Sequence, residues 1–391
     1  MRVLFTAPPA IGHFHPLVPL AAAARDAGHT VAFATPPEFA PMVERVGFEH
    51  RPAGLEGSAP EMVRLLEARG RLSGSERAAF MQREGFAGVI ARGMAADLLG
   101  ICDVWQPDVL VRDAWALGGC VAAETRNIPH AIVQSTAPRA WVYANIAEPL
   151  AALRAAHGLP PDPELWMLER YLALSPFPPS LDGLRDWPRP TLHRYRVLPF
   201  DRSGDESTPA WPLPFPDAPL VYATLGTVLN ARTDILGHFV EALRDERVNL
   251  VVTVGRNGDP GQFGPQPPNV RIERYIPQSS LFPRCDLVIC HGGSGTVLAA
   301  VAHGIPMVLT PFTSDQPANA ERCAALGLAR VVMPADVSAT TIREAALDVL
   351  HDPTYRQGAA RLRAEMDALP DLEYVVGLLE RLAHERAPIL A

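Results

Sequence analysis

Short apolar runs alternate with amphipathic stretches along this chain. In the first half, strands are predicted at Val3–Ala7, Thr30–Ala34, Val109–Val111 and Ala131–Val133. In the second half, they are predicted at Leu220–Thr224, Leu250–Val254, Val270–Ile272, Leu287–Cys290 and Met307–Leu309. Helices are predicted at Leu17–Ala27, Met62–Leu99 and Ala114–Thr125. Strands that alternate with helices are typical of parallel sheets covered by helices, so each half is predicted to be a doubly wound α/β domain.

The length of 391 residues also favours two domains, because single cores rarely grow so large. From Pro199 to Pro219, six of twenty-one positions are proline, which is typical of a linker. We therefore expect a first domain at 1–199, a linker at 200–216 and a second domain at 217–368. A final segment, 369–391, contains a helix whose packing partner the pattern does not identify.

Composition narrows the class of ligand. The chain is 48% hydrophobic and 20% charged, with a net charge of -8 and no basic stripe, which argues against nucleic acid and favours a small molecule. Pro8 and Pro9 end the first apolar run far short of a membrane span, so we expect a cytoplasmic protein without membrane insertion. Five cysteines without a Cys-x-x-Cys pair indicate reduced thiols, and Cys290 is expected to be a buried apolar filler.

A glycine-rich run carries the clearest chemical signal. His291-Gly292-Gly293-Ser294-Gly295-Thr296 lies between a predicted strand and a predicted helix. Unpaired amides and the positive end of a helix dipole at such a turn favour a diphosphate. Further along, Asp315 and Gln316 follow the next predicted strand, where they could hold hydroxyl groups. Diphosphate and polyol together indicate a nucleotide sugar.

Other ligand loops fit the sequence less well. No Gly-x-Gly-x-x-Gly follows the first strand, and His291–Thr296 lacks the Gly-Lys-Ser/Thr ending of a triphosphate loop, so nicotinamide and triphosphate sites are disfavoured. Gly255–Gly258 is interpreted as a simple turn. Because no Asp-x-Asp run is present, we expect neither a metal nor another cofactor.

Two residues in the first half are candidates for acid–base chemistry. His13 follows the first strand, and Asp113 ends a second strand at the same predicted rim. A carboxylate bonded to one imidazole nitrogen would fix the tautomer and stabilise the charged ring. The alternatives are a structural or solvated histidine, and an aspartate that caps a helix beginning at Ala114.

The order of these motifs resembles the inverting nucleotide-sugar glycosyltransferases of the GT-B fold, in which two Rossmann-like domains face each other across a cleft. The segment from Tyr275-Ile276-Pro277-Gln278 to Asp315-Gln316 is similar to the donor-binding signature of that family. The Gly12-His13-x-x-Pro16 motif and the segment Val111–Ala114 resemble its N-terminal motifs. The resemblance covers the whole chain in order, and implies a last helix that crosses back to the first domain.

This resemblance implies roles for individual residues. Tyr275 would stack on the base, the Ile276 backbone would pair with the edge of the base, and Gln278 belongs to the same donor signature. The diphosphate would be held by the residues of the glycine-rich run, namely His291, Gly293, Ser294, Gly295 and Thr296. Gly226 and Thr227 would touch donor phosphate from the other side, and Asp315 and Gln316 would bind sugar hydroxyls. His13 would be the base, with Asp113 as its partner.

Ala299 departs from the plant members of this family, which carry a glutamate there that binds the ribose hydroxyls. A deoxyribose needs that carboxylate less, so a dTDP-sugar is favoured over a UDP-sugar as donor. The expected acceptor is a small hydrophobic natural-product aglycone, bound by segments 62–99 and 141–172. Alternatives are a nucleotide-sugar 2-epimerase, transfer to a lipid acceptor, or a non-catalytic nucleotide-binding auxiliary subunit. A homodimer is compatible with the sequence.

Overall fold

The computed structural model describes residues 1–136, 140–182, 190–202, 211, 213–226 and 232–391. The chain forms two compact units, of which unit 1 comprises Met1–Pro176, Leu184–Gly204 and Leu369–Ala391, and unit 2 comprises Phe177–Gly183 and Asp205–Ala368. The predicted linker at 200–216 lies partly outside the described residues.

The grouping of Phe177–Gly183 with unit 2 differs from the expected first domain, 1–199. Ser180 accounts for the difference. Its backbone amide donates to the Glu365 carboxylate at 2.7 Å, and its carbonyl oxygen accepts from Arg322 at 2.5 Å. Both partners belong to unit 2, so these bonds tie the segment to that unit.

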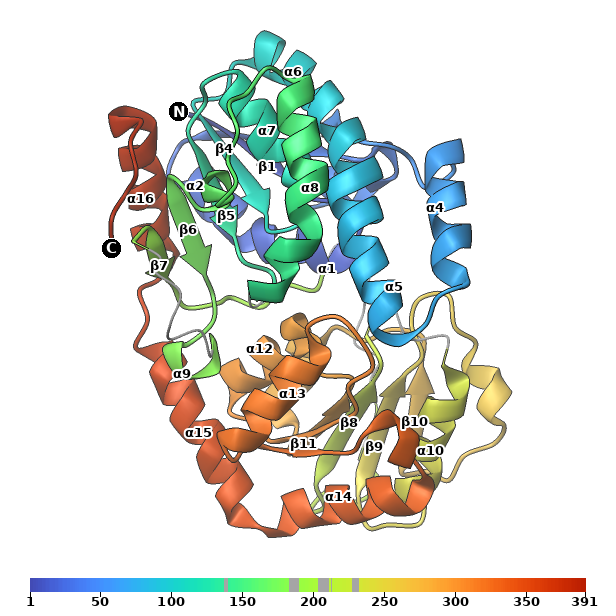
Figure 1. Cartoon of the computed structure of the whole chain (residues 1–391). Coiled ribbons are helices and arrows are strands. Elements are labelled where there is room, and N and C mark those ends of the chain that lie inside the picture. Colours follow the sequence, from blue (N-terminus) through green and yellow to red (C-terminus); the bar gives the residue numbers. More distant parts are fainter. Residues whose placement is uncertain (137–139, 183–189, 203–210, 212, 227–231) are drawn as a thin grey trace. The chain divides into compact units, whose positions relative to one another are not determined.

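Unit 1 is built on a parallel sheet of seven strands in the order β3-β2-β1-β4-β5-β6-β7 (Figure 1). Its strands are β1 (Arg2–Thr6), β2 (Thr30–Thr35), β3 (Glu49–Pro52), β4 (Val109–Asp113), β5 (His130–Val133), β6 (Leu172–Ser175) and β7 (Leu192–Arg194). Its helices are α1 (Ile11–Phe14), α2 (Val18–Asp26), α3 (Ala40–Arg45), α4 (Pro60–Gly70), α5 (Gly74–Phe80), the π-helix η3 (Met81–Ile90), α6 (Ala91–Trp105), α7 (Leu117–Thr125), α8 (Ala140–Ala156) and α16 (Leu372–Glu385).

Both faces of this sheet are covered by helices. Val3 and Phe5 pack with residues of α2 and α16, whereas Leu4 between them packs with residues of α6 and α7. This alternation follows from the two-residue period of a strand, and explains why β1 is apolar throughout.

The last helix, α16, begins after Asp371, whose side chain accepts a hydrogen bond from the Tyr374 amide. Its apolar residues recur with the helical period and form one buried stripe, consisting of Leu372, Val375, Val376, Leu379 and Leu382. This stripe packs on α2 within the core of unit 1. The partner that the periodicity alone did not identify is therefore α2.

By length and composition, the helical run Glu76–Trp105 could span a membrane, and 50% of its apolar window is buried inside the structure. Met94 and Leu98 of this run are fully buried and belong to the core cluster beneath the sheet. A core helix passes the same test of length and composition, so the run carries little weight as a membrane signal.

Unit 2 has a parallel sheet of six strands in the order β10-β9-β8-β11-β12-β13 (Figure 1). Its strands are β8 (Leu220–Thr224), β9 (Asn249–Thr253), β10 (Val270–Glu273), β11 (Leu287–Cys290), β12 (Met307–Leu309) and β13 (Ala329–Val331). Its helices are α9 (Pro179–Asp182), α10 (Thr233–Leu243), α11 (Gln278–Leu281), α12 (Ser294–His303), α13 (Gln316–Ala325), α14 (Ala339–His351) and α15 (Pro353–Asp367).

All nine predicted strands are present, with ends displaced by at most two residues. Cys290 is fully buried, and burial raises the pKa of its thiol to about 12, which confirms the filler interpretation.

Candidate functional site

In each unit, the candidate residues come directly after the two adjacent strands at which the strand order of the sheet reverses. In unit 1 this point lies between β1 and β4, and in unit 2 between β8 and β11. His13 follows β1 and Asp113 ends β4, while Gly226 follows β8 and His291 follows β11. Open parallel sheets bind ligands beyond the carboxyl ends of such strand pairs. In both units, the candidate residues therefore lie where the sheet topology favours binding of a ligand.

His13 and Asp113 contact each other directly. His13 Nδ1 lies 3.0 Å from Asp113 Oδ1, and the two side chains are 17% and 0% exposed, respectively. Parallel pairing of Thr6 with Arg112 brings the ends of β1 and β4 side by side. His13 lies in the short helix α1, whereas the sequence placed it in a loop. A buried carboxylate at this nitrogen orients the ring, and would stabilise the imidazolium that forms when a general base accepts a proton at Nε2.

The helix-cap interpretation of Asp113 is wrong. The helix after β4 begins at Leu117, three residues later than expected, and Asp113 is instead the last residue of the strand. Asp113 Oδ1 accepts a hydrogen bond from the Trp115 amide at 2.8 Å, which fixes the carboxylate in a tight turn. Asp113 Oδ1 therefore both stabilises the turn and contacts His13.

Two further residues contact His13 that the sequence interpretation missed. The Ser135 hydroxyl lies 3.1 Å from His13 Nδ1, and the Phe86 ring lies edge-on to the imidazole at 5.9 Å between ring centroids. Phe86 is presented by the π-helix η3, a geometry often found at functional sites. Ser135 comes two residues after β5, next to the end of β4. Ser135 could have been identified from the expected pairing of β4 with β5.

In unit 2, the His291 ring occupies the space between two glycines. A Cβ atom at Gly226 would lie 2.5 Å from His291 Cε1, and one at Gly293 would overlap Nε2. Gly226 also has a φ of +70°, a left-handed conformation that glycine adopts readily. Only glycine fits at both positions. The lack of side chains there allows the turn after β8 to pack against the loop before α12. Thr227 lies outside the described residues.

The loop after β11 leads directly into α12, whose first residue is Ser294. The amides of Gly295 and Thr296 lie in the first turn, where no intrahelical acceptor exists for them. Together with the helix dipole, they form the anion-binding end that the glycine-rich run predicted. Their contact with a diphosphate stays a prediction.

His291 is neutral at physiological pH. Burial lowers the pKa of its imidazole to about 4, and the charge of Asp315 opposes this shift only in part. In the part of the chain that the structure describes, His291 Nδ1 is buried without a hydrogen-bond partner. A neutral imidazole can still donate one hydrogen bond to a phosphate oxygen.

Asp315 stabilises the glycine-rich loop before α12 through hydrogen bonds. Asp315 Oδ2 accepts from the Ser294 amide at 3.1 Å and from the Ser294 hydroxyl at 2.5 Å. Asn319, which the sequence interpretation missed, donates to Gly292 O at 2.9 Å and to Asp315 Oδ2 at 3.1 Å. A single carboxylate oxygen of Asp315 therefore accepts hydrogen bonds from both Ser294 and Asn319. The expected contact between Asp315 and sugar hydroxyls stays a prediction.

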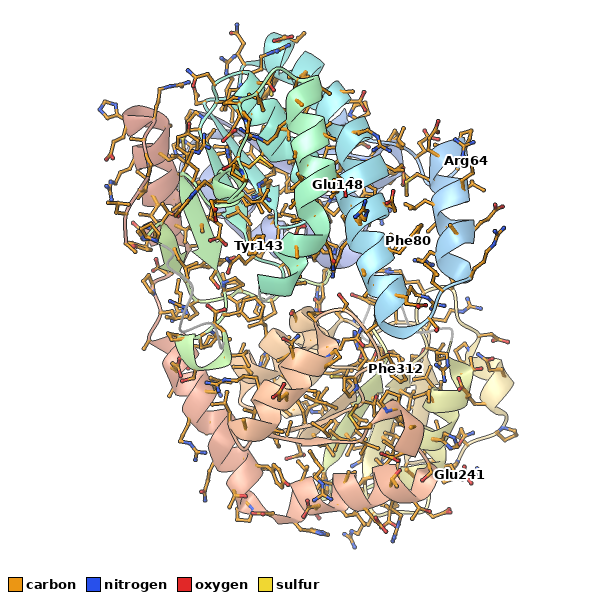
Figure 2. The ribbon with its side chains drawn as sticks, in the orientation of Figure 1. Arg64, Phe80, Tyr143, Glu148, Glu241 and Phe312 are labelled. Carbon is orange, nitrogen blue, oxygen red and sulfur yellow. The ribbon has the colours of Figure 1, made fainter. Side chains whose placement is uncertain are left out.

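Gln316 has a similar internal role. Its side-chain oxygen accepts from the amides of Phe312 and Thr313 at 2.9 and 3.1 Å, and its side chain is 6% exposed. Phe312, labelled in Figure 2, lies in the loop that follows β12. Gln316 thus shapes the loop after β12, and its predicted contact with sugar hydroxyls also stays untested.

The predicted base-binding segment lies after β10. The guanidinium of Arg256 lies 4.0 Å from the centroid of the Tyr275 ring, so a cation covers one face of that ring. Ile276 is 3% exposed, and Gln278 donates to the Thr296 hydroxyl at 3.2 Å, which joins this segment to α12. The loop at Gly255–Gly258 is a turn closed by a bond from the Gly258 amide to Gly255 O, as predicted.

Comparisons with known proteins give one consistent result. Residues 240–382 match the family model described as "Erythromycin biosynthesis protein CIII-like, C-terminal domain". The chain is 33% identical to the L-demethylnoviosyl transferase of Streptomyces niveus, covering 99% of this chain and 98% of the relative. It is 29% identical to the 10-deoxymethynolide desosaminyltransferase of Streptomyces venezuelae, covering 99% of both chains.

A solved structure extends this likeness to the fold. The glycosyltransferase VinC, crystallised in complex with DTDP, superposes with a TM-score of 0.81 at 28% identity, covering 98% of this chain and all of VinC. The similarity therefore includes both units and the connection between them.

Proposed function

The chain belongs to the family of antibiotic-biosynthesis glycosyltransferases with the GT-B fold, and from this premise we propose that it transfers a deoxysugar from a dTDP-sugar to a hydroxyl group of a small hydrophobic aglycone, with inversion at the anomeric carbon. The observation that carries the proposal is the 3.0 Å contact between His13 and Asp113 at the strand ends of unit 1. A purely nucleotide-binding protein has no use for such a pair.

The proposed reaction is a single displacement. With Nδ1–H held by Asp113, the His13 Nε2 lone pair takes the proton of the acceptor hydroxyl. The acceptor oxygen forms a bond to the anomeric carbon while the bond from that carbon to the diphosphate oxygen breaks. TDP leaves with the bonding electrons, and attack from the opposite face inverts the configuration.

The charge that develops on the leaving diphosphate would be stabilised by unit 2. The first-turn amides of α12 and the neutral His291 imidazole are fixed in place before reaction, by Gln278, Asp315 and the glycines around the ring. Such preorganised donors are commonly the largest electrostatic contribution to catalysis. The proposal includes no metal ion.

The preference for dTDP is supported by Ala299. This residue is 5% exposed within α12 and offers no carboxylate for a ribose 2′-hydroxyl. The DTDP complex of the similar protein VinC agrees with this preference.

The test compares binding with turnover. We expect calorimetry to show tighter binding of TDP than of UDP to the wild-type protein. We also expect His13→Ala to retain TDP affinity and to lose transfer from a dTDP-deoxysugar to a panel of hydroxylated polyketides. Full activity of His13→Ala would refute the base assignment. Failure of both nucleotides to bind the wild type would refute the donor site, and sugar isomerisation without an acceptor would identify an epimerase.

A further inference from the structure

Arg112 is buried directly beside the proposed acid–base pair. It precedes Asp113 in β4, and it is 0% exposed. Successive residues of a strand point to opposite faces of the sheet, so Arg112 and Asp113 leave β4 on opposite sides. On the Arg112 side, a Cβ atom at Gly119 of α7 would lie 3.5 Å from Arg112 Cβ. The arginine therefore packs against α7, on the face of the sheet opposite Asp113.

The charge of Arg112 has no acidic partner in the described part of the chain. Its guanidinium donates there only to backbone carbonyl oxygens, and its Nε is buried without a partner. Arg154, another fully buried arginine of unit 1, instead pairs with Glu124 at 2.6 Å. Arginine stays protonated in proteins, and burial of an unpaired charge is costly. An apolar side chain would avoid this cost, so the contribution of Arg112 must come from the hydrogen bonds that it donates.

Those hydrogen bonds hold the turn that follows β4. Arg112 Nη1 donates to Asp113 O at 3.3 Å and to Ala114 O at 3.1 Å, and Nη2 donates to Leu168 O at 2.5 Å. The turn is also closed from within, since the Ala116 amide donates to Asp113 O at 3.0 Å. Hydrogen bonds from a charged donor are stronger than those between neutral groups. Arg112 therefore ties the turn firmly to the segment at Leu168.

Two contacts of His13 depend on the geometry of that turn. Asp113 Oδ1 accepts from the Trp115 amide at 2.8 Å and lies 3.0 Å from His13 Nδ1. The Trp115 ring packs on Phe86 at 4.9 Å between centroids, and Phe86 contacts the imidazole. A shift of the turn would therefore disturb both the carboxylate and an aromatic neighbour of His13.

We propose that Arg112 is a positioning residue for the His13–Asp113 pair, whose guanidinium holds the turn after β4 so that Asp113 Oδ1 stays in contact with His13 Nδ1. This inference rests on the proposed function, in which the pair performs the proton transfer. Arg112 acts through the backbone, from the opposite face of the sheet, and needs no contact with either substrate. Without it, Asp113 keeps its charge but loses its fixed position, and should act more weakly on His13.

The test measures how strongly Asp113 acts on His13, with Arg112 and without it. NMR titration of the full-length chain gives the proton affinity of the His13 imidazole, and His13→Gln assigns its signals. In the wild type, Asp113→Asn should lower that proton affinity by about tenfold or more, the usual effect of a carboxylate at this distance. In the Arg112→Met background, Asp113→Asn should lower it by less than about threefold.

This double-mutant cycle cancels the direct effect of the arginine charge. Loss of the positive charge changes the proton affinity of His13 equally with either residue at position 113, so only a change in the action of Asp113 alters the cycle. The other neighbours of the ring, Ser135 and Phe86, are present in every variant. An effect of Asp113→Asn that is equally large with and without Arg112 overturns the proposal.

Arg154→Met is the matched control. It also removes a buried guanidinium that donates to a backbone carbonyl of the same unit, that of Pro160. The full effect of Asp113→Asn on His13 should remain in Arg154→Met, because Arg154 pairs with Glu124 and not with the turn. If Arg154→Met weakens that effect as much as Arg112→Met does, the cause is general loosening of unit 1, and the proposal is overturned.

Arg112→Lys provides a second variant at the same position. It keeps a positive charge but replaces two donor nitrogens by one, so the effect of Asp113→Asn should lie between those in the wild type and in Arg112→Met. This variant also carries the test if Arg112→Met does not fold. An Asp113→Asn effect of the wild-type size in Arg112→Lys overturns the proposal.

The cycle concerns the resting protein and needs no sugar donor or acceptor. If Asp113→Asn leaves the proton affinity of His13 unchanged in the wild type, the acid–base pair of the proposed function fails, and the positioning role fails with it. If the pair is intact in the wild type and in Arg112→Met alike, only the positioning role of Arg112 fails.

Discussion

The imidazole of His291 occupies the space that a side chain at Gly226 would need. A single methyl group at Gly226 would approach His291 Cε1 to 2.5 Å, and the backbone there has a φ of +70°. The position of the histidine and the absence of a side chain on the neighbouring turn are therefore coupled. This coupling leads to the first prediction.

Gly226→Ala should displace the His291 ring and weaken TDP binding by about tenfold or more, because both the ring and the turn must move. Calorimetric titration measures the effect. The control is Gly237→Ala on helix α10, where a Cβ atom meets nothing within 4 Å. That variant should bind TDP normally, and an equal loss in both variants would contradict the coupling.

Asp113→Asn should lower kcat by about 10²- to 10⁴-fold while TDP affinity stays unchanged, since an amide cannot stabilise a protonated imidazole. Asp103→Asn is the matched control, because Asp103 pairs with Arg126 at the surface of the same unit. Ser135→Ala should cause a smaller loss than Asp113→Asn. If Asp113→Asn retains the wild-type kcat, Asp113 has no role in activating His13.

The low pKa of His291 predicts a loss of stability in mild acid. The unfolded chain binds a proton at this residue near pH 6.5, whereas the folded protein does so only near pH 4, so folding is progressively disfavoured as the pH falls between these values. At pH 5, the expected loss relative to pH 7.5 is at most about 2 kcal/mol. Urea unfolding of the wild type and of His291→Gln at both pH values isolates this contribution. A wild type that loses no more stability than His291→Gln would show that the residue titrates normally.

Tyr275→Leu should weaken TDP binding by about 5- to 100-fold, the range measured for stacking of one base on an aromatic ring. Tyr275→Phe retains the ring and should bind TDP within about twofold of the wild type. Arg256 lies over one face of the ring at 4.0 Å, so stacking of the base would use the opposite face. Equal binding by the leucine and phenylalanine variants would exclude stacking at this residue.

The sequence predicted the central strands well because their side chains are buried on both faces. β3, β6, β7 and β13 were missed. Three of them lie at sheet edges, where Glu49, Arg194 and Arg330 carry polar side chains and each strand pairs with one neighbour only. A short run of this kind does not differ in pattern from a loop. β6 is also buried throughout, and its sequence pattern does not explain why it was missed.

In the candidate site too, some residues could be predicted from their local sequence, whereas others depend on tertiary contacts. The strand, glycine turn and helix start of the glycine-rich run could be predicted from its own sequence, because they depend on local geometry alone. Ser135 and Asn319 could not, because nothing in their neighbouring residues indicates a ligand. They contact the candidate site only through the pairing of β4 with β5 and the approach of α13 to the glycine-rich loop.

Helix α16 completes the core of unit 1, although all of unit 2 precedes it in the chain. His29 beside α2 contacts Glu380 of α16 at 2.9 Å, across a separation of 351 residues. During synthesis, the sheet that holds His13 is therefore complete long before the helix that covers it emerges from the ribosome. Until then the nascent chain exposes the apolar surface of α2, so unit 1 can complete its core only after all of unit 2 has been synthesised.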